Sequence, residues 1–132
     1  MKKELLARIE REVLGWPGVV KEEMQGGTGR GGFRVPPATV FRLGRRHLGH
    51  VHHNEGGLAD FSFPKEVRED LVRAGRAIPH PAFPGSKTDA SHEVRSADDA
   101  SEVIELFRVT YERALAREAR HAARKTERKN GA

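Results

Sequence analysis

The 132-residue chain has no cysteine, only one tryptophan and one tyrosine, and no apolar run of the roughly 18 residues that a membrane span needs. The absence of cysteine excludes a disulfide framework, a cysteine-ligated metal site and a thiol nucleophile. Charges are scattered through the N-terminal segment MKKELLARIEREVLG, which therefore lacks the apolar centre of a signal peptide. We expect a cytoplasmic protein with one modest core, no membrane contact and a single domain.

Basic residues outnumber acidic ones by 24 to 19, and the excess lies at one end of the chain. Residues 117–132 carry six basic and two acidic side chains, so residues 1–116 are nearly neutral. Residues 1–116 therefore lack the broad positive surface of a nucleic-acid-binding domain. We expect an α+β domain over residues 1–116 and a basic helical or frayed tail over 117–132. Weak contact with nucleic acid or an acidic partner is expected only through 117–129.

Hydrophobic periodicity predicts the order of the elements. Helical spacing occurs at 3–14, from Pro64 to Gly75, and over a long stretch that begins at the capping pair Ser96 and Asp99. Extended segments predict strands at 18–24, 38–43, 46–54, 58–63 and 91–95, with a proline-rich loop at 76–90. Short turns between strands imply antiparallel pairing. The predicted fold is a single α+β domain, an antiparallel β-sheet with helices packed on one face and a long C-terminal helix.

Two segments contain incomplete motifs. The run GTGRGG, residues 27–32, has the G-x-G-x-x-G spacing of a dinucleotide-binding turn. The sequence FRVPP follows it, and its prolines prevent the helix that this turn requires, so a flexible connection is predicted. Gly44 followed by His50-x-His52 fits the opening of a cupin metal motif, but Glu55 comes one residue too early to complete it.

A histidine cluster is the main candidate for chemistry, because four of the seven histidines lie within residues 47–53. In a strand, alternation sends His50 and His52 to one face and His47 and His53 to the other. Two imidazoles on one face can share a metal ion, or they can simply form hydrogen bonds on a polar surface.

The next turn decides what His50 and His52 face. A three-residue turn, Glu55 to Gly57, pairs Asn54 with Leu58, Val51 with Phe61 and His52 with Asp60; a four-residue turn puts both histidines beside Ala59 and Phe61 instead. The first register is favoured because it pairs apolar Val51 with Phe61. His50, His52 and Asp60 are then candidate ligands of a divalent metal, since two histidines and a carboxylate form a common ligand set. No other cofactor is expected.

The loop at 76–90 is long for a small domain, and long loops are often functional. Prolines flank His80 and stiffen the segment, which would hold His80, Ser86 or Lys87 over the sheet. An imidazole that titrates near neutral pH can act as a general acid or base. The alternative is that the prolines only direct the path of the chain.

Three segments carry a family resemblance: FRLGRRHLGHVHHN at 41–54, LADFSFPKEVREDLVRAGRAIPH at 58–80 and SADDASEVIELFRVTYERA at 96–114. The stretch from about Phe41 to Ala114 resembles the luciferase-domain family, small and largely uncharacterised proteins named after the luciferase of bioluminescent fungi. That fungal enzyme oxidises a hydroxylated pyrone with molecular oxygen, without metal or flavin. The resemblance implies that the catalytic candidates are His50, His52, Arg68 and His80.

The resemblance also draws attention to residues 84–88. Family members commonly carry a Pro-Asp-Ser-Gly-Trp-like segment here, whereas this chain reads Pro-Gly-Ser-Lys-Thr. Thr88 replaces the aromatic ring, so a ligand that used the ring would be lost or changed. Ser86, Lys87 and Thr88 are the candidate ligand-binding residues.

Two functions are compatible with these observations. In the first, a small ligand, aromatic if the resemblance holds, binds in a pocket lined by His50, His52 and residues 79–88. A histidine removes a proton from a phenol or enol, and the resulting anion reacts with oxygen. In the second, the protein is a non-catalytic protein- or nucleic-acid-interaction module that uses its basic C-terminal helix. A homodimer through an exposed sheet face is compatible with both.

Overall fold

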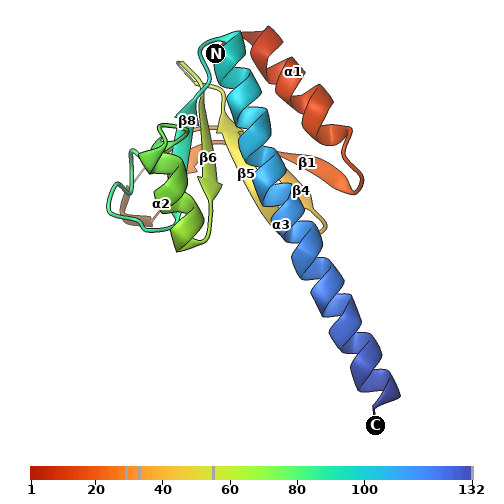
Figure 1. Ribbon diagram of the computed structural model, residues 1–132. Coiled ribbons are helices and arrows are strands. Elements are labelled where there is room, and N and C mark those ends of the chain that lie inside the picture. Colours follow the sequence, from red (N-terminus) through yellow and green to blue (C-terminus); the bar gives the residue numbers. More distant parts are fainter. Residues whose placement is uncertain (29, 33, 55, 132) are drawn as a thin grey trace.

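The structure is a computed structural model that describes residues 1–28, 30–32, 34–54 and 56–131. Six strands form one antiparallel sheet in the order β1-β4-β5-β6-β8-β7 (Figure 1). The strands are β1 (Val19–Met24), β4 (Ala38–Leu43), β5 (Arg46–His52), β6 (Leu58–Ser62), β7 (Ile78–Pro79) and β8 (Asp89–Glu93). The helices are α1 (Lys3–Leu14), α2 (Lys65–Arg73) and α3 (Ala97–Asn130). The predicted single α+β domain with a long C-terminal helix is confirmed.

The core lies between the sheet and α3, which crosses one sheet face, while α1 packs beside α3 (Figure 1). Phe107 of α3 is fully buried, and its ring centroid lies 5.0 Å from that of Phe41 and 4.8 Å from that of Phe61. Leu71 of α2 joins the same core. Burying three aromatic rings in edge-to-face contact ties the helix to the two strands that flank β5.

The pairing of β5 with β6 differs from the expected register by two residues. His50 lies opposite Asp60, and His52 lies opposite Leu58, so the expected pairs His52–Asp60, Val51–Phe61 and Asn54–Leu58 are wrong. A shift of two residues keeps every side chain on its face. The prediction that both histidines share a face with Asp60 is therefore confirmed. The connecting turn is longer than three residues, and Glu55 lies outside the described part of it.

Packing explains this register. A Cβ atom placed on Gly49 would lie 2.8 Å from both Phe61 and Phe107. The Phe61 ring therefore occupies the space that a side chain at position 49 would need, and β6 must align so that this ring meets the glycine. The expected register was based only on the pair Val51 and Phe61. The strand pattern could not show that the Phe107 ring of α3 also packs against Gly49.

A β-bulge interrupts the pairing of β4 with β5. Phe41 pairs with Gly49 and Arg42 with His47, which leaves Leu48 as an extra residue whose side chain is buried in the core. Alternation is lost across the bulge, so His47 comes to the same face as His50. The prediction that His47 lies opposite His50 is wrong for this reason. His53 does lie on the other face, where its Nε2 is 2.6 Å from the hydroxyl oxygen of Thr39.

Two predicted loops contain short strands. Ile78 and Pro79 form β7 and pair with Ser91 and Ala90, so the segment 76–90 is not a loop throughout, and β8 begins two residues before its predicted start. The glycine-rich segment contributes β2 (Gly27–Thr28) to a small hairpin with β3 (Arg34–Val35). Gly29, which belongs to the rejected dinucleotide pattern, lies outside the described residues.

The start of α3 is capped as predicted, because the Ser96 hydroxyl accepts the Asp99 backbone N–H at 3.1 Å. After Ala114, all described side chains of this helix are exposed, and it projects away from the domain (Figure 1). Within the described residues, no helix combines the length and apolar character that crossing a membrane requires.

Candidate functional site

Asp60 is the centre of the candidate site. It lies in the middle of β6, on the sheet face away from α3, and only 3% of its surface is exposed. Its Oδ1 atom accepts the Ser91 hydroxyl from β8 at 2.5 Å. This bond fixes the carboxylate and leaves Oδ2 to face the neighbouring histidines.

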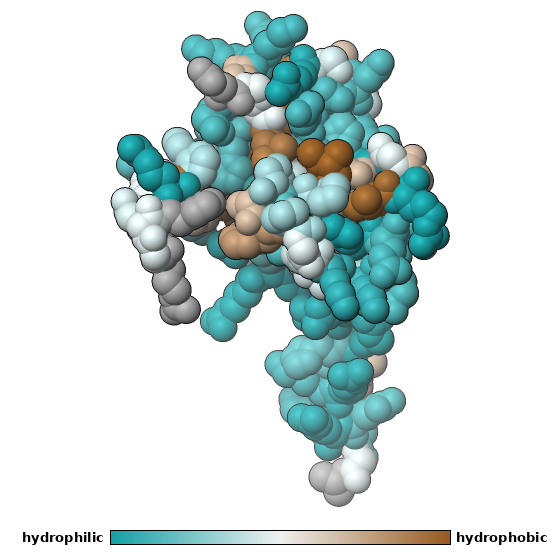
Figure 2. Space-filling view, turned by 90° about the vertical axis from the view of Figure 1, so that its left-hand side faces the viewer, coloured by the Kyte–Doolittle hydropathy of each residue, from teal (hydrophilic) through white to brown (hydrophobic). Residues whose placement is uncertain are grey.

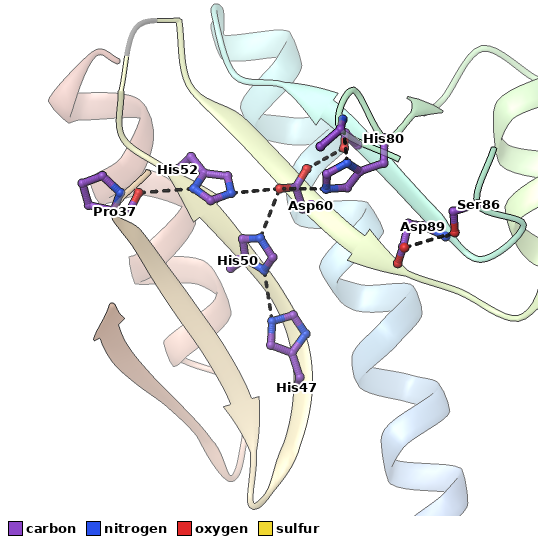
Figure 3. A network of polar contacts seen from close by, with 10 residues as sticks. Pro37, His47, His50, His52, Asp60, His80, Ser86 and Asp89 are labelled. Atoms are coloured by element: carbon purple, nitrogen blue, oxygen red, sulfur yellow. Dashed lines mark hydrogen bonds and ion pairs between the residues drawn. The ribbon is translucent and has the colours of Figure 1, made fainter. Parts of the chain in front are cut away.

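Three imidazoles converge on that single oxygen (Figure 3). The Nε2 atoms of His52, His50 and His80 lie 2.9, 3.1 and 3.5 Å from Asp60 Oδ2. Two of them come from β5, and His80 follows β7. The structure therefore brings together three of the four residues that the resemblance marked as catalytic, together with the carboxylate that the strand pattern added.

Both ring nitrogens of His52 face hydrogen-bond acceptors, an arrangement that favours the doubly protonated ring. Its Nε2 faces the Asp60 carboxylate, and its Nδ1 lies 3.3 Å from the carbonyl oxygen of Pro37, which can only accept. The hydrogen bond to Asp60 raises the pKa of His52, although partial burial acts in the opposite direction. Burial alone would raise the pKa of Asp60, but hydrogen bonds from His50, His52 and Ser91 outweigh it and hold that pKa below its usual range. Asp60 and His52 therefore form an ion pair whenever the imidazole is protonated.

His80 has a fixed tautomer. Its Nδ1 accepts the backbone N–H of Ala82 at 3.1 Å, so in the neutral ring the proton is on Nε2, directed at Asp60. The Phe83 ring packs beside this imidazole with 5.1 Å between ring centroids. The proline-rich segment thus orients its histidine toward the sheet, which is one of the two alternatives that the sequence left open.

His47 extends the cluster by one more imidazole. Its Nε2 lies 3.1 Å from Nδ1 of His50, so a chain of hydrogen bonds leads from Asp60 through His50 to His47 (Figure 3). Desolvation lowers the pKa of His47 to about 4, helped by the neighbouring His50 and Arg42, so the ring is neutral at pH 7. Sequence reasoning missed this residue. The available signal was Gly49, because a glycine inside a strand often marks a bulge.

The cluster also offers three possible ligand atoms to a metal ion. One ligand atom each from His50, His52 and Asp60 lies within 4.8 Å of the others. Ligands about 2.1 Å from an ion and at right angles to one another are about 3 Å apart, close to the two separations between a histidine and Asp60, 2.9 and 3.1 Å. The Pro37 carbonyl and the Ser91 hydroxyl would orient His52 and Asp60 from outside, as the outer partners of metal ligands do.

The other predicted site residues lie apart from the cluster. The Arg68 guanidinium donates from Nε to the carbonyl oxygen of Asp89 at 3.1 Å, which holds α2 against the start of β8. Ser86 donates to the Asp89 carboxylate at 3.0 Å and accepts backbone N–H groups from Thr88 and Asp89. Lys87 and Thr88 are exposed. These contacts shape the loop, and none of them joins the imidazoles.

Apolar side chains are exposed close to the histidines. Ile78 pairs with Ser91 and is 43% exposed, and Phe83 beside His80 is 57% exposed. Figure 2 shows hydrophobic residues gathered near the middle of the side that carries α2, within a mostly hydrophilic surface. An aromatic or aliphatic part of a ligand would find contacts here.

The fold and the cluster together define a small α+β domain with a histidine–aspartate centre on its open sheet face. The sequence model of the Luciferase domain matches residues 45–110, half of the chain, and includes His47, His50, His52, Asp60 and His80. The chain belongs to the luciferase-domain family. No protein of curated function and no solved structure matches it.

Proposed function

We propose that this luciferase-domain protein binds a small molecule with an acidic O–H group, such as a phenol or an enol, and removes its proton. The convergence of three imidazole Nε2 atoms on one buried carboxylate oxygen carries this proposal. A buried carboxylate destabilises the fold unless its hydrogen-bond partners stay in place, so the histidines around Asp60 must be held in fixed positions. Proton transfer requires acid–base groups that are held in this way.

The chain from Asp60 to His47 supplies a route for the proton. In the tautomer that donates from Nε2 to Asp60, His50 can accept on Nδ1 a hydrogen bond from Nε2 of His47. When the free nitrogen of His47 takes a proton from the substrate, the Nε2 proton passes to His50. The positive charge then lies beside the Asp60 carboxylate, at 3.1 Å. His47 can thus act as a base although it is weakly basic, because the positive charge ends on His50.

Oxygen chemistry is the proposed continuation. Removal of the proton leaves an electron-rich phenolate or enolate, and His52, when protonated, provides a positive charge within the same cluster. Direct reaction of such an anion with molecular oxygen is the cofactor-independent chemistry that the family resemblance implies.

A divalent ion on His50, His52 and Asp60 is the alternative use of the same atoms. When bound, it would act as a Lewis acid that favours the ionised form of a substrate O–H. Both alternatives place the ionised oxygen of the substrate at the cluster, and the metal content of the purified protein separates them.

The experiment uses 4-nitrophenol, whose ionised form absorbs visible light. We expect saturable binding and a larger phenolate fraction on the protein than in the same buffer. The His50→Gln variant should lose the added phenolate, because it breaks the chain between Asp60 and His47. The matched control is His92→Gln, since the ring of His92 bonds to the carbonyl of Glu93 instead of the cluster. Equal absorbance for His50→Gln and wild type would contradict the proposal.

The projecting end of α3 supports a second candidate, a weak contact with polyanions such as nucleic acid. Its side chains after Ala114 are exposed, and residues 117–129 carry six basic and two acidic groups. Binding of a short DNA duplex should weaken steeply with added salt. The change Arg120→Glu with Arg124→Glu should abolish it, whereas His50→Gln should leave it intact.

A further inference from the structure

A cavity of about 410 Å³ lies apart from the Asp60 carboxylate, where the start of β5, the start of α2 and the middle of α3 meet. Figure 1 shows these three segments together at the end of the domain from which α3 projects. The polar side chains that line it include Arg45, Arg46, Arg113, Arg117, His47 and Ser62. Its volume is in the range of small-molecule sites.

The four arginines are poorly balanced by acidic groups. Arg46 lies 3.9 Å from Glu118, whereas Arg45, Arg113 and Arg117 have no carboxylate within 4.0 Å among the residues that the structure describes. Arg113 and Arg117 are one turn apart on the same helix face, where like charges destabilise a helix. An anion in the cavity would relieve this repulsion.

The start of α2 adds a second, independent feature. Pro64, which lines the cavity, is the N-cap residue of this nine-residue helix; no side chain hydrogen-bonds to its first N–H groups, and its first turn carries one acidic residue, Glu66. The first backbone N–H groups of a helix have no partner within it, and the helix dipole makes this end positive. Anions bind at such ends, and phosphate does so in many proteins.

We propose that this cavity binds the phosphate group of a small molecule. Guanidinium groups bind phosphate oxygens in pairs of parallel hydrogen bonds. Four arginines against one glutamate leave an excess of positive charge that suits a doubly charged phosphate better than a single carboxylate. His47 lines the cavity, so the remainder of the bound molecule would extend past His47 toward His50.

The inference also names the substrate class, and this part rests on the proposed function. A phosphate in the cavity would place an adjoining hydroxyl group near the outer end of the chain that leads through His50 to Asp60. The substrate would then be a phosphorylated phenol or enol. Phosphate binding itself needs none of this chemistry, so the two claims can fail separately.

The test measures binding of inorganic phosphate to the full chain by calorimetry, in a phosphate-free buffer at low and constant ionic strength. We expect saturable binding that the double variant Arg45→Gln with Arg113→Gln weakens by about tenfold or more. Both side chains are exposed, so the variant should keep the fold, and its thermal unfolding checks this. The matched control is Arg120→Gln with Arg124→Gln, which removes the same charge farther along α3 and should leave phosphate binding unchanged.

Three results would overturn the phosphate site: no saturable binding, equal loss in both double variants, or binding of a DNA duplex without binding of phosphate. The last result would assign the arginines to a polyanion surface. His50→Gln should still bind phosphate. If it does so while the nitrophenol experiment fails, the cavity stands and the proposed acid–base function falls.

Discussion

The hydroxyl of Ser91 lies 2.5 Å from Oδ1 of Asp60, on the side of the carboxylate turned away from the histidines. Both side chains are buried, so no solvent can replace this bond. The serine thereby holds the carboxylate in the orientation that presents Oδ2 to the three imidazoles.

Ser91→Ala should therefore destabilise the fold. Loss of the bond leaves Oδ1 buried without its partner, which costs about 1–3 kcal/mol in the free energy of unfolding. The variant should also raise the pKa of Asp60, because one of the hydrogen bonds that lower it is gone. Urea denaturation measures the first effect. Ser62→Ala, on an exposed serine of β6, is the control, and equal stability of the two variants would contradict the assigned role.

The contribution of His52 to stability should depend on pH. Its pKa is raised in the folded state, so protonation stabilises the fold fully below the ordinary value of 6.5, and the stabilisation is lost as pH rises through the folded pKa. Asp60 is ionised throughout this range. The difference in unfolding free energy between wild type and His52→Gln should therefore shrink from pH 6 to pH 9. A difference that is constant or grows would show that His52 is not held as a cation.

Gly49→Ala tests the packing that sets the strand register. The new Cβ would lie 2.8 Å from the rings of Phe61 and Phe107, and such overpacking costs about 1–3 kcal/mol. Gly85→Ala is the matched control, because a Cβ on that glycine meets open space. Thermal unfolding should show a lowered midpoint for Gly49→Ala only. Similar midpoints would mean that the rings can move aside.

Metal content decides between the two uses of the cluster. Mass spectrometry of tag-free protein should find about one iron, zinc or manganese ion per chain if His50, His52 and Asp60 are ligands. His52→Ala should then lose the ion, and chelation should lower the unfolding midpoint of the wild type but not of the variant. Absence of metal in both proteins would leave the metal-free acid–base centre.

Local sequence patterns predicted much of the fold. The helix 3–14 and the strand 38–43 have the predicted bounds, because their apolar spacing and bounding residues are local properties. The shared face of His50, His52 and Asp60 was also predictable, since a shift of two residues does not change faces.

The features that were missed depend on distant contacts. The bulge that turns His47 toward His50 places Leu48 in a core that the helices complete. The approach of His80 to Asp60 requires β7 to pair with β8 and β8 with β6. The arginine cavity joins residues about 70 positions apart, such as Arg45 and Arg117, and no local periodicity links them.

The pairing of β4 with β5 determines where the chain can be cut to give a fragment for expression. The family match begins at residue 45, after β4 ends, although β4 pairs with β5 and supplies Phe41 to the core. An excised 45–110 fragment would carry every cluster histidine, yet would leave one side of β5 unpaired and remove the Pro37 carbonyl that orients His52. Unpaired strand edges promote association between chains. The smallest unit worth expressing therefore begins upstream of residue 45, and aggregation of the 45–110 fragment would reflect the loss of β4 instead of any weakness of the cluster.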